Sequence, residues 1–223
     1  MKIKPELLTL YGVTDRSHLG GRSLLAVVEE ILKGGATLIQ LREKDMDPEA
    51  FLREAVQIKK VTDAYHVPLI INDNIQVCLA SGAAGVHVGQ SDMAAGQVRR
   101  LLGEDKIIGV TAKTVEQAKA AEQAGADYLG CGAVFGSATK LDTKKMSLET
   151  LDEICRSVSI PVTAIGGISM DNIRQLQGHL MDGAAVVSAL FSAQDPCGAA
   201  VALKKEMLDI LSKRPEGGVR HGH

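Results

Sequence analysis

Three polar side chains alternate with apolar ones in the stretch LIQLREKD, residues 38–45. In an extended chain Gln40, Arg42 and Lys44 point to the same side, because successive side chains alternate between the two faces of a strand. An amide and two cations on one face indicate an anionic partner, which is either an acidic side chain or a phosphorylated ligand. The alternative is a solvated strand end whose long side chains reach into water.

Two carboxylates follow the next apolar runs of the chain. Asn72 and Asp73 come directly after two isoleucines, and Asp92 follows GVHVGQS. Carboxylates beside cations suit Mg²⁺, which takes one or two of them and completes its octahedron with water and phosphate oxygens. The alternative role of both aspartates is to cap the helices that follow. For Asp92 considered alone, capping is the favoured interpretation.

A second anion site is predicted nearer the end of the chain. Gly166 and Gly167, in AIGGIS, let the backbone approach a ligand, and MDNIRQL after them is expected to begin a helix whose N–H groups face an anion. Ser188, after two valines, adds a hydrogen-bond donor. The pattern predicts a phosphorylated ligand without saying which one.

The segment VFGSATKLDTKKMS is long and polar, and its Ser137, Thr139 and Lys140 could reach over the site. A solvated loop is the alternative. His87 lies within an apolar run, where a hydrogen-bonded core histidine is the default interpretation. The sequence shows no Ser–His pairing or other evident nucleophile, so covalent catalysis is not predicted. A site rich in cations and poor in bases instead suits the departure of a leaving group.

Eight short apolar runs must position these residues, and amphipathic helix patterns such as SLLAVVEEILKGG lie between most of them. The runs are LLTLYGVTD, TLIQLREK, PLIIND, AGVHVGQ, KIIGVTA, DYLGCGAVF, PVTAIGGI and GAAVVSAL. Runs this short and apolar are typical of strands buried on both faces. Eight strand–helix units in about 210 residues predict an α/β fold, a (β/α)₈ TIM barrel, as a single domain over residues 1–212.

The alternative fold is a doubly wound sheet, which would bind a ligand through a Gly-rich first turn. The first turn here, VTDRSHLGGRS, contains no GxGxxG, so the barrel is preferred. In such a barrel the functional residues lie on loops at the carboxyl ends of the strands, which is where the polar residues above are expected. The polar, Gly-rich tail, residues 213–223, is expected to be unstructured.

The composition argues against some classes of binding partner. The chain has 223 residues, a formal net charge of −2 and 3% aromatic residues with no Trp, which argues against nucleic acid. No apolar run approaches the ~18 residues of a membrane helix, and no signal-peptide pattern is present, which predicts a cytoplasmic protein without a membrane partner. Four scattered cysteines predict buried free thiols. Small molecules are the expected partners, and the sequence leaves open whether the protein forms a homo-oligomer.

These motifs, in this order, resemble those of the thiamine-phosphate synthase family, which is a barrel of this size. The matching motifs are QLREK, NDN, GVHVGQSD, GVTAKT, the TK of the loop after the sixth run, and IGGI. Any one of them is weak alone. Six in register, from LYGVTD to VVSALF, cover nearly the whole predicted fold.

The resemblance implies an enzyme that joins hydroxymethylpyrimidine pyrophosphate to a thiazole phosphate, with Mg²⁺ as cofactor. Pyrophosphate would leave first, and the thiazole nitrogen would capture the pyrimidine carbocation. The expected catalytic residues are Arg42, Lys44, Thr111 and Lys140. Gln40 would orient the pyrimidine, and His87 would lie near the pyrimidine. The pyrophosphate would be held by Arg42, Lys44, Asn72 and Lys140, and Mg²⁺ by Asp73 and Asp92. The thiazole phosphate would be held by Ser137, Thr139, Gly167 and Ser188, beside Gly166.

The chain departs from the family pattern at a few positions. Ala133 and Gly136 replace prolines in the loop after the sixth run, and Ser137 replaces a threonine. Losing two φ-restricted residues predicts a more mobile loop. Asn74 replaces a second aspartate, and Thr111 replaces a serine.

Two other functions fit the same fold. Thiazole tautomerase relatives use a histidine near the end of the fifth strand, where this chain reads TAKT, and they lack the full pyrophosphate set. A non-catalytic barrel that senses thiamine precursors would not need to keep a metal site. The synthase interpretation is therefore preferred.

Overall fold

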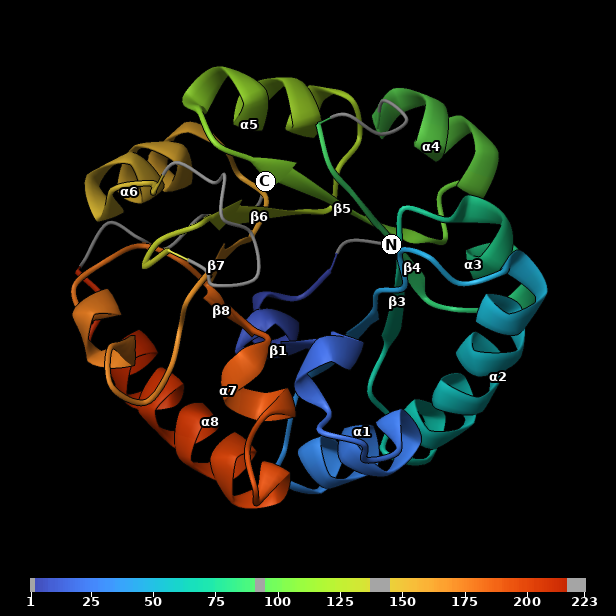
Figure 1. Ribbon diagram of the computed structural model, residues 1–223. Coiled ribbons are helices and arrows are strands. Elements are labelled where there is room, and N and C mark those ends of the chain that lie inside the picture. The colour runs from blue at the N-terminus through green and yellow to red at the C-terminus, as the bar shows by residue number, and fades with distance from the viewer. Residues whose placement is uncertain (1–2, 91–94, 137–144, 216–223) are drawn as a thin grey trace.

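The computed structural model describes residues 3–90, 95–136 and 145–215. Eight parallel strands pair in chain order, and β8 pairs with β1 to close the ring. They are β1 (Leu10–Val13), β2 (Leu38–Leu41), β3 (Leu69–Asn72), β4 (Gly85–Val88), β5 (Ile107–Ala112), β6 (Tyr128–Gly132), β7 (Val162–Ile165) and β8 (Gly183–Val186). Helices surround the strands as an outer ring (Figure 1). The predicted (β/α)₈ barrel is confirmed.

The helices are α1 (Leu24–Lys33), α2 (Pro48–Ala64), α3 (Ile75–Ser81), α4 (Ala95–Leu102), α5 (Val115–Gln123), α6 (Leu148–Ser157), α7 (Ser188–Phe191) and α8 (Pro196–Ser212), with 3-10 turns η1 (Pro5–Leu8), η2 (Arg16–His18) and η3 (Ile173–Leu176). Helix α1 shows how the sequence specifies them. Its N-cap Ser23 accepts a hydrogen bond from the N–H of Ala26, and its apolar stripe, which includes Val28 and Ile31, is buried.

Two apolar layers hold the barrel together. The larger layer lies between the strands and the helices. The smaller layer fills the inside of the barrel and includes Leu8, Leu38, Ile70 and Ile107. Because Leu8 belongs to η1, the turn before β1, this segment closes the barrel at the amino ends of the strands. The opposite end, where the strands finish, is where a site can open.

The segment after β7 differs from the prediction. It was expected to begin a helix at MDNIRQL, but the chain makes only the 3-10 turn η3. Asn172, which precedes the turn, makes no capping hydrogen bond there. Its side chain instead accepts from the N–H of Ser169 at 2.9 Å and donates to the carbonyl of Gly167 at 2.8 Å. The amide thus stabilises the loop, and the predicted helix N-terminus at this anion site is wrong.

The tail also differs from the prediction at its first residues. Helix α8 ends at Ser212. Arg214, however, forms an ion pair with Asp182, with 3.1 Å between Nη1 and Oδ1, and donates to the carbonyl of Met181. Asp182 is buried just before β8, and a buried carboxylate needs such a partner. Arg214 therefore packs on the fold, and residues 216–223 lie outside the described part.

Three of the four cysteines, Cys78, Cys131 and Cys155, are buried free thiols as predicted, whereas Cys197 is partly exposed. Within the described ranges, no helix has the length and apolar character needed to cross a membrane.

Candidate active site

A cavity of about 250 Å³ opens at the carboxyl ends of the strands. Eight residues predicted from the sequence line it: Gln40, Arg42, Asn72, His87, Thr111, Gly166, Gly167 and Ser188. They come from the ends of β2, β3, β4, β5, β7 and β8. Residues up to 148 positions apart in the chain therefore meet in one cavity. This is the placement expected for a barrel whose functional residues lie at the carboxyl ends of its strands.

Lys44 does not line this cavity. It lies in a neighbouring hollow, whose wall shares Asp15 and Arg42 with the cavity, and its side chain is exposed. The reason is that β2 ends at Leu41, so the alternation of an extended chain does not continue as far as Lys44. The expected common face holds for Gln40 and Arg42 only.

Arg42 is held at the mouth by the neighbouring strand end. Its backbone N–H donates to the hydroxyl of Thr14 at 2.9 Å. Its guanidinium Nη1 lies 3.9 Å from a carboxylate oxygen of Asp15, which is too long for a hydrogen bond. Burial tends to raise the pKa of Asp15, but hydrogen bonds from Ser17 outweigh this effect and lower it, so the carboxylate is charged. Asp15 therefore orients Arg42 without consuming the donors that an anion would need.

The sequence left two roles open for Asp73, metal binding and helix capping. The structure assigns the capping role to its neighbour Asn74. Asn74 caps α3, with its Oδ1 accepting from the N–H of Val77 at 2.9 Å, so the capping role considered for Asp73 is wrong. Asp73 has a left-handed backbone, φ 60°, which is uncommon outside glycine. Its side chain is exposed at the end of β3 and accepts a hydrogen bond from Asn72, which lines the cavity. This conformation places a carboxylate beside the mouth.

Gly166 and Gly167 form the wall on the β7 side. Their φ angles are 104° and 70°, a region that side chains rarely adopt. A Cβ on Gly167 would lie 1.9 Å from the carbonyl oxygen of Gly136, so the loops after β6 and β7 pack directly against each other. Gly136 itself has φ 78°, which a proline cannot adopt. The left-handed backbone of Gly136 thus sets the path of this loop.

A hydrogen-bonded row of side chains forms the floor of the cavity. Gln40 Nε2 donates to Tyr11 Oη at 2.5 Å, and Tyr11 Oη lies 2.7 Å from Tyr128 Oη. His87 connects the row to β5, because its Nδ1 is 3.0 Å from Tyr128 Oη and its Nε2 is 3.0 Å from Thr111 Oγ1. Burial raises the pKa of both phenols well above the ordinary value, so both keep their protons. His87 is thus both a hydrogen-bonded core histidine and a cavity residue.

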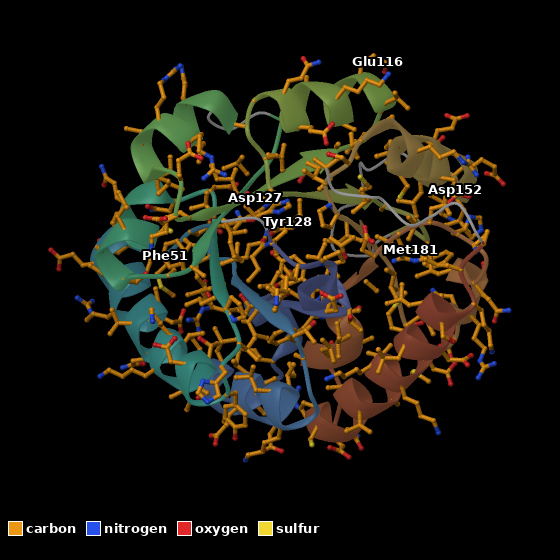
Figure 2. All side chains as sticks on the ribbon, turned by 180° about the vertical axis from the view of Figure 1, so that it is seen from behind. Phe51, Glu116, Asp127, Tyr128, Asp152 and Met181 are labelled. Carbon is orange, nitrogen blue, oxygen red and sulfur yellow. The ribbon has the colours of Figure 1, made fainter. Side chains whose placement is uncertain are left out.

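Three residues of the site, Tyr11, Tyr128 and Lys113, were not predicted from the sequence. Tyr11 and Tyr128 sit in strands β1 and β6, and Figure 2 shows Tyr128 inside the ring of helices. Lys113 follows β5 and lines the cavity, two positions after Thr111. The alternation that identified Arg42 from Gln40 also points from Thr111 to Lys113 and was the available signal. The tyrosine pair has no local signal, because its members are 117 positions apart.

Four predicted site residues, Asp92, Ser137, Thr139 and Lys140, lie outside the described residues.

The fold and the cavity define the class: a (β/α)₈ barrel with a polar pocket at the carboxyl ends of its strands. Comparison with known proteins gives the family. The family model described as thiamine monophosphate synthase matches residues 10–190, and the chain belongs to this family.

Similar proteins agree with that assignment. A thiamine-phosphate synthase of Clostridium tetani is 49% identical over 84% of this chain and 90% of its own length. One of Ruminiclostridium cellulolyticum is 51% identical over 84% of this chain and 89% of its own length. The solved structure of thiamine phosphate pyrophosphorylase from Pyrococcus furiosus superimposes with a TM-score of 0.86 at 36% identity, covering 93% of this chain and 98% of that chain. The protein is therefore an enzyme of thiamine phosphate synthesis that acts on small molecules.

Proposed function

We propose that the enzyme joins hydroxymethylpyrimidine pyrophosphate to the ring nitrogen of a thiazole phosphate, giving thiamine phosphate and pyrophosphate. The observation that carries the proposal is the distribution of polar groups around the cavity. An amide and a guanidinium lie on the β2 and β3 side with Arg42 and Asn72, and backbone groups of Gly166 and Gly167 lie on the β7 side with Ser188 after β8. Two separate anion-binding arcs suit a reaction that brings together a pyrophosphate and a monophosphate.

The first arc would stabilise the leaving group. The bond between the pyrimidine methylene carbon and the pyrophosphate oxygen breaks, and the electron pair goes to the oxygen. Arg42 and Asn72 would donate hydrogen bonds to the developing charge, and fixed donors stabilise such charge without reorganisation. Lys44, in the hollow that shares Arg42, would reach the outer phosphate. Gln40, buried at the floor, would orient the pyrimidine ring.

The second arc would hold the nucleophile. The phosphate of the thiazole would lie against Gly167 and Ser188, and its ring nitrogen would form the new bond to the methylene carbon. No general base is needed, because this nitrogen carries no proton. That suits a cavity floor whose two phenols both keep their protons.

Mg²⁺ is the proposed cofactor, and the described residues fit it. Asp73 is an exposed carboxylate beside Asn72, held in a left-handed backbone at the mouth. Among the described residues no group of three or more His, Cys, Asp or Glu side chains could form a complete metal cage. Mg²⁺ suits one or two carboxylates, here Asp73 and Asp92, with water and phosphate oxygens completing its shell. When bound, the ion would neutralise charge on the pyrophosphate.

The test is a turnover assay with both substrates, with and without Mg²⁺. We expect pyrophosphate release that requires the thiazole phosphate and the metal, with thiamine phosphate formed in equal amount. Pyrophosphate release without product, or tight binding of both compounds without turnover, would contradict the proposal. Conversion of a thiazole phosphate tautomer in the absence of the pyrimidine substrate would instead support an isomerase.

A further inference from the structure

The five side chains on the cavity floor form one continuous row of hydrogen bonds. Gln40, Tyr11, Tyr128, His87 and Thr111 come from β2, β1, β6, β4 and β5, and adjacent members are 2.5 to 3.0 Å apart. Four of them line the cavity, and Tyr128, fully buried, connects the two ends from below. A row in which each member has one proton to give must have a direction, so the donor at one end determines the proton position at the other.

The direction follows from the amide. Gln40 presents Nε2, which can only donate, so Tyr11 must direct its own proton to Tyr128. Tyr128 in turn donates to Nδ1 of His87. A neutral imidazole that accepts at Nδ1 carries its proton on Nε2, which faces the hydroxyl oxygen of Thr111. Thr111 therefore accepts within the row, and its own proton is available to the cavity.

The opposite direction leaves a buried donor without a partner. If Thr111 donated to His87, Tyr128 would donate to Tyr11, which would then accept from both sides. Among the described residues, Tyr11 Oη has hydrogen bonds only to Gln40 and Tyr128, and Tyr11 is 1% exposed. Its proton would have no acceptor, which is unfavourable for a buried hydroxyl. The first direction gives the proton of each tyrosine an acceptor within the row.

We propose that Tyr11 and Tyr128 are positioning residues that hold His87 as its Nε2–H tautomer and thereby fix the Thr111 hydroxyl as a donor to the ligand. The consequence for catalysis rests on the proposed function, in which an anionic leaving group forms in this cavity. A donor aimed at that charge lowers the barrier, whereas a hydroxyl turned to donate to His87 presents a lone pair and repels the charge. Neither tyrosine needs to touch the substrate for this effect.

The first experiment reads the tautomer directly. Two-bond ¹⁵N–¹H correlation spectra of the ligand-free full chain, with the His87 signals assigned by their loss in His87→Gln, should show a proton on Nε2 and none on Nδ1. In Tyr128→Phe the Nδ1–H form should become substantially populated, because the donor to Nδ1 is removed. Tyr65→Phe is the matched control, since Tyr65 contacts Glu29 outside the cavity, and should leave the spectrum unchanged.

An Nδ1–H or doubly protonated His87 in the wild type would overturn the proposal, as would an unchanged tautomer in folded Tyr128→Phe. Because the wild-type spectrum decides the direction by itself, the test holds even where a variant does not fold. It also uses no substrate. A correct tautomer without turnover on the two proposed substrates would therefore refute the proposed function while leaving the row of hydrogen bonds intact.

The second experiment is a double-mutant cycle on kcat. Tyr128→Phe and Thr111→Val should each lower kcat about tenfold with little change in KM, since both remove the same oriented donor. The double variant should lose no more than Thr111→Val alone, because Tyr128 acts through Thr111. Thr111→Ser should retain kcat. Additive losses would show that Tyr128 supports the fold and not the hydroxyl, and would refute its positioning role.

Discussion

Replacing Gly167 by alanine tests whether the close contact between the loops after β6 and β7 shapes the cavity. Two costs can be separated. The first is the left-handed backbone, φ 70°, which costs a residue with a Cβ about 1 kcal/mol or slightly more. The second is the Cβ itself, which would lie 1.9 Å from the carbonyl oxygen of Gly136, whereas Cβ atoms essentially never come closer than 3.0 Å. That backbone carbonyl must move by about 1.1 Å.

Gly178 provides the matched control. It has a similar left-handed backbone, φ 87°, but an added Cβ would meet nothing within 4 Å. Gly178→Ala should therefore lose about 1 kcal/mol of unfolding free energy, and Gly167→Ala about 3 kcal/mol, because overpacking adds roughly 2 kcal/mol. In a chain of this size the difference corresponds to roughly 4–8 °C in Tm.

Thermal unfolding measures the predicted loss of stability, and steady-state kinetics measure the predicted change in KM. Gly167→Ala should also raise KM for the thiazole phosphate about tenfold, since a displaced wall loses a hydrogen bond to the phosphate. Gly178→Ala should leave KM unchanged. Equal Tm values for the two variants would mean that the Gly136 carbonyl yields without cost, and the reasoning from the close contact would fail. An unchanged KM in a destabilised Gly167→Ala would remove this wall from the thiazole site.

Three further predictions concern the β2 and β3 side of the mouth. Lys44→Ala should reduce turnover at least about tenfold while Tm stays within about 1 °C, because the side chain is exposed; normal activity, or an unfolded variant, would contradict this. Asp73→Asn should raise the Mg²⁺ concentration that gives half-maximal activity, and an unchanged metal titration would exclude Asp73 from the metal site. Asn74→Ala should lower the unfolding free energy by about 1 kcal/mol through loss of the α3 cap, with kcat largely retained; Gln76→Ala, an exposed change on the same helix, is the control and should cost less.

The fold was predictable because its signals are local. A strand covered on both faces is apolar along its whole length, and eight such runs separated by amphipathic patterns leave few arrangements. Helix α1 is an example, since both its cap, Ser23, and its buried stripe can be read from the sequence. The helix expected after β7 failed because one amide, Asn172, bonds to the loop and not to a helix end. Nothing in its type distinguishes the two choices.

The site was predictable where it depends on alternation and not where it depends on a strand end or a distant partner. Gln40 and Arg42 line the cavity as expected, but Lys44 does not, because the strand stops at Leu41, a boundary that the residue types do not mark. Tyr11 has the opposite problem. Its role depends on a partner in β6, and residue spacing carries no information about such a contact.

The pairing of β1 with β8 has a consequence for how the protein is made. Leu10 pairs with Ala184, so the first strand can complete its hydrogen bonds only after the last strand has left the ribosome. Until then, the strands that carry the row of hydrogen bonds on the cavity floor belong to an open sheet. Contacts of such long sequence separation slow folding. The nascent chain must therefore keep two strand edges from pairing with other chains during most of its synthesis.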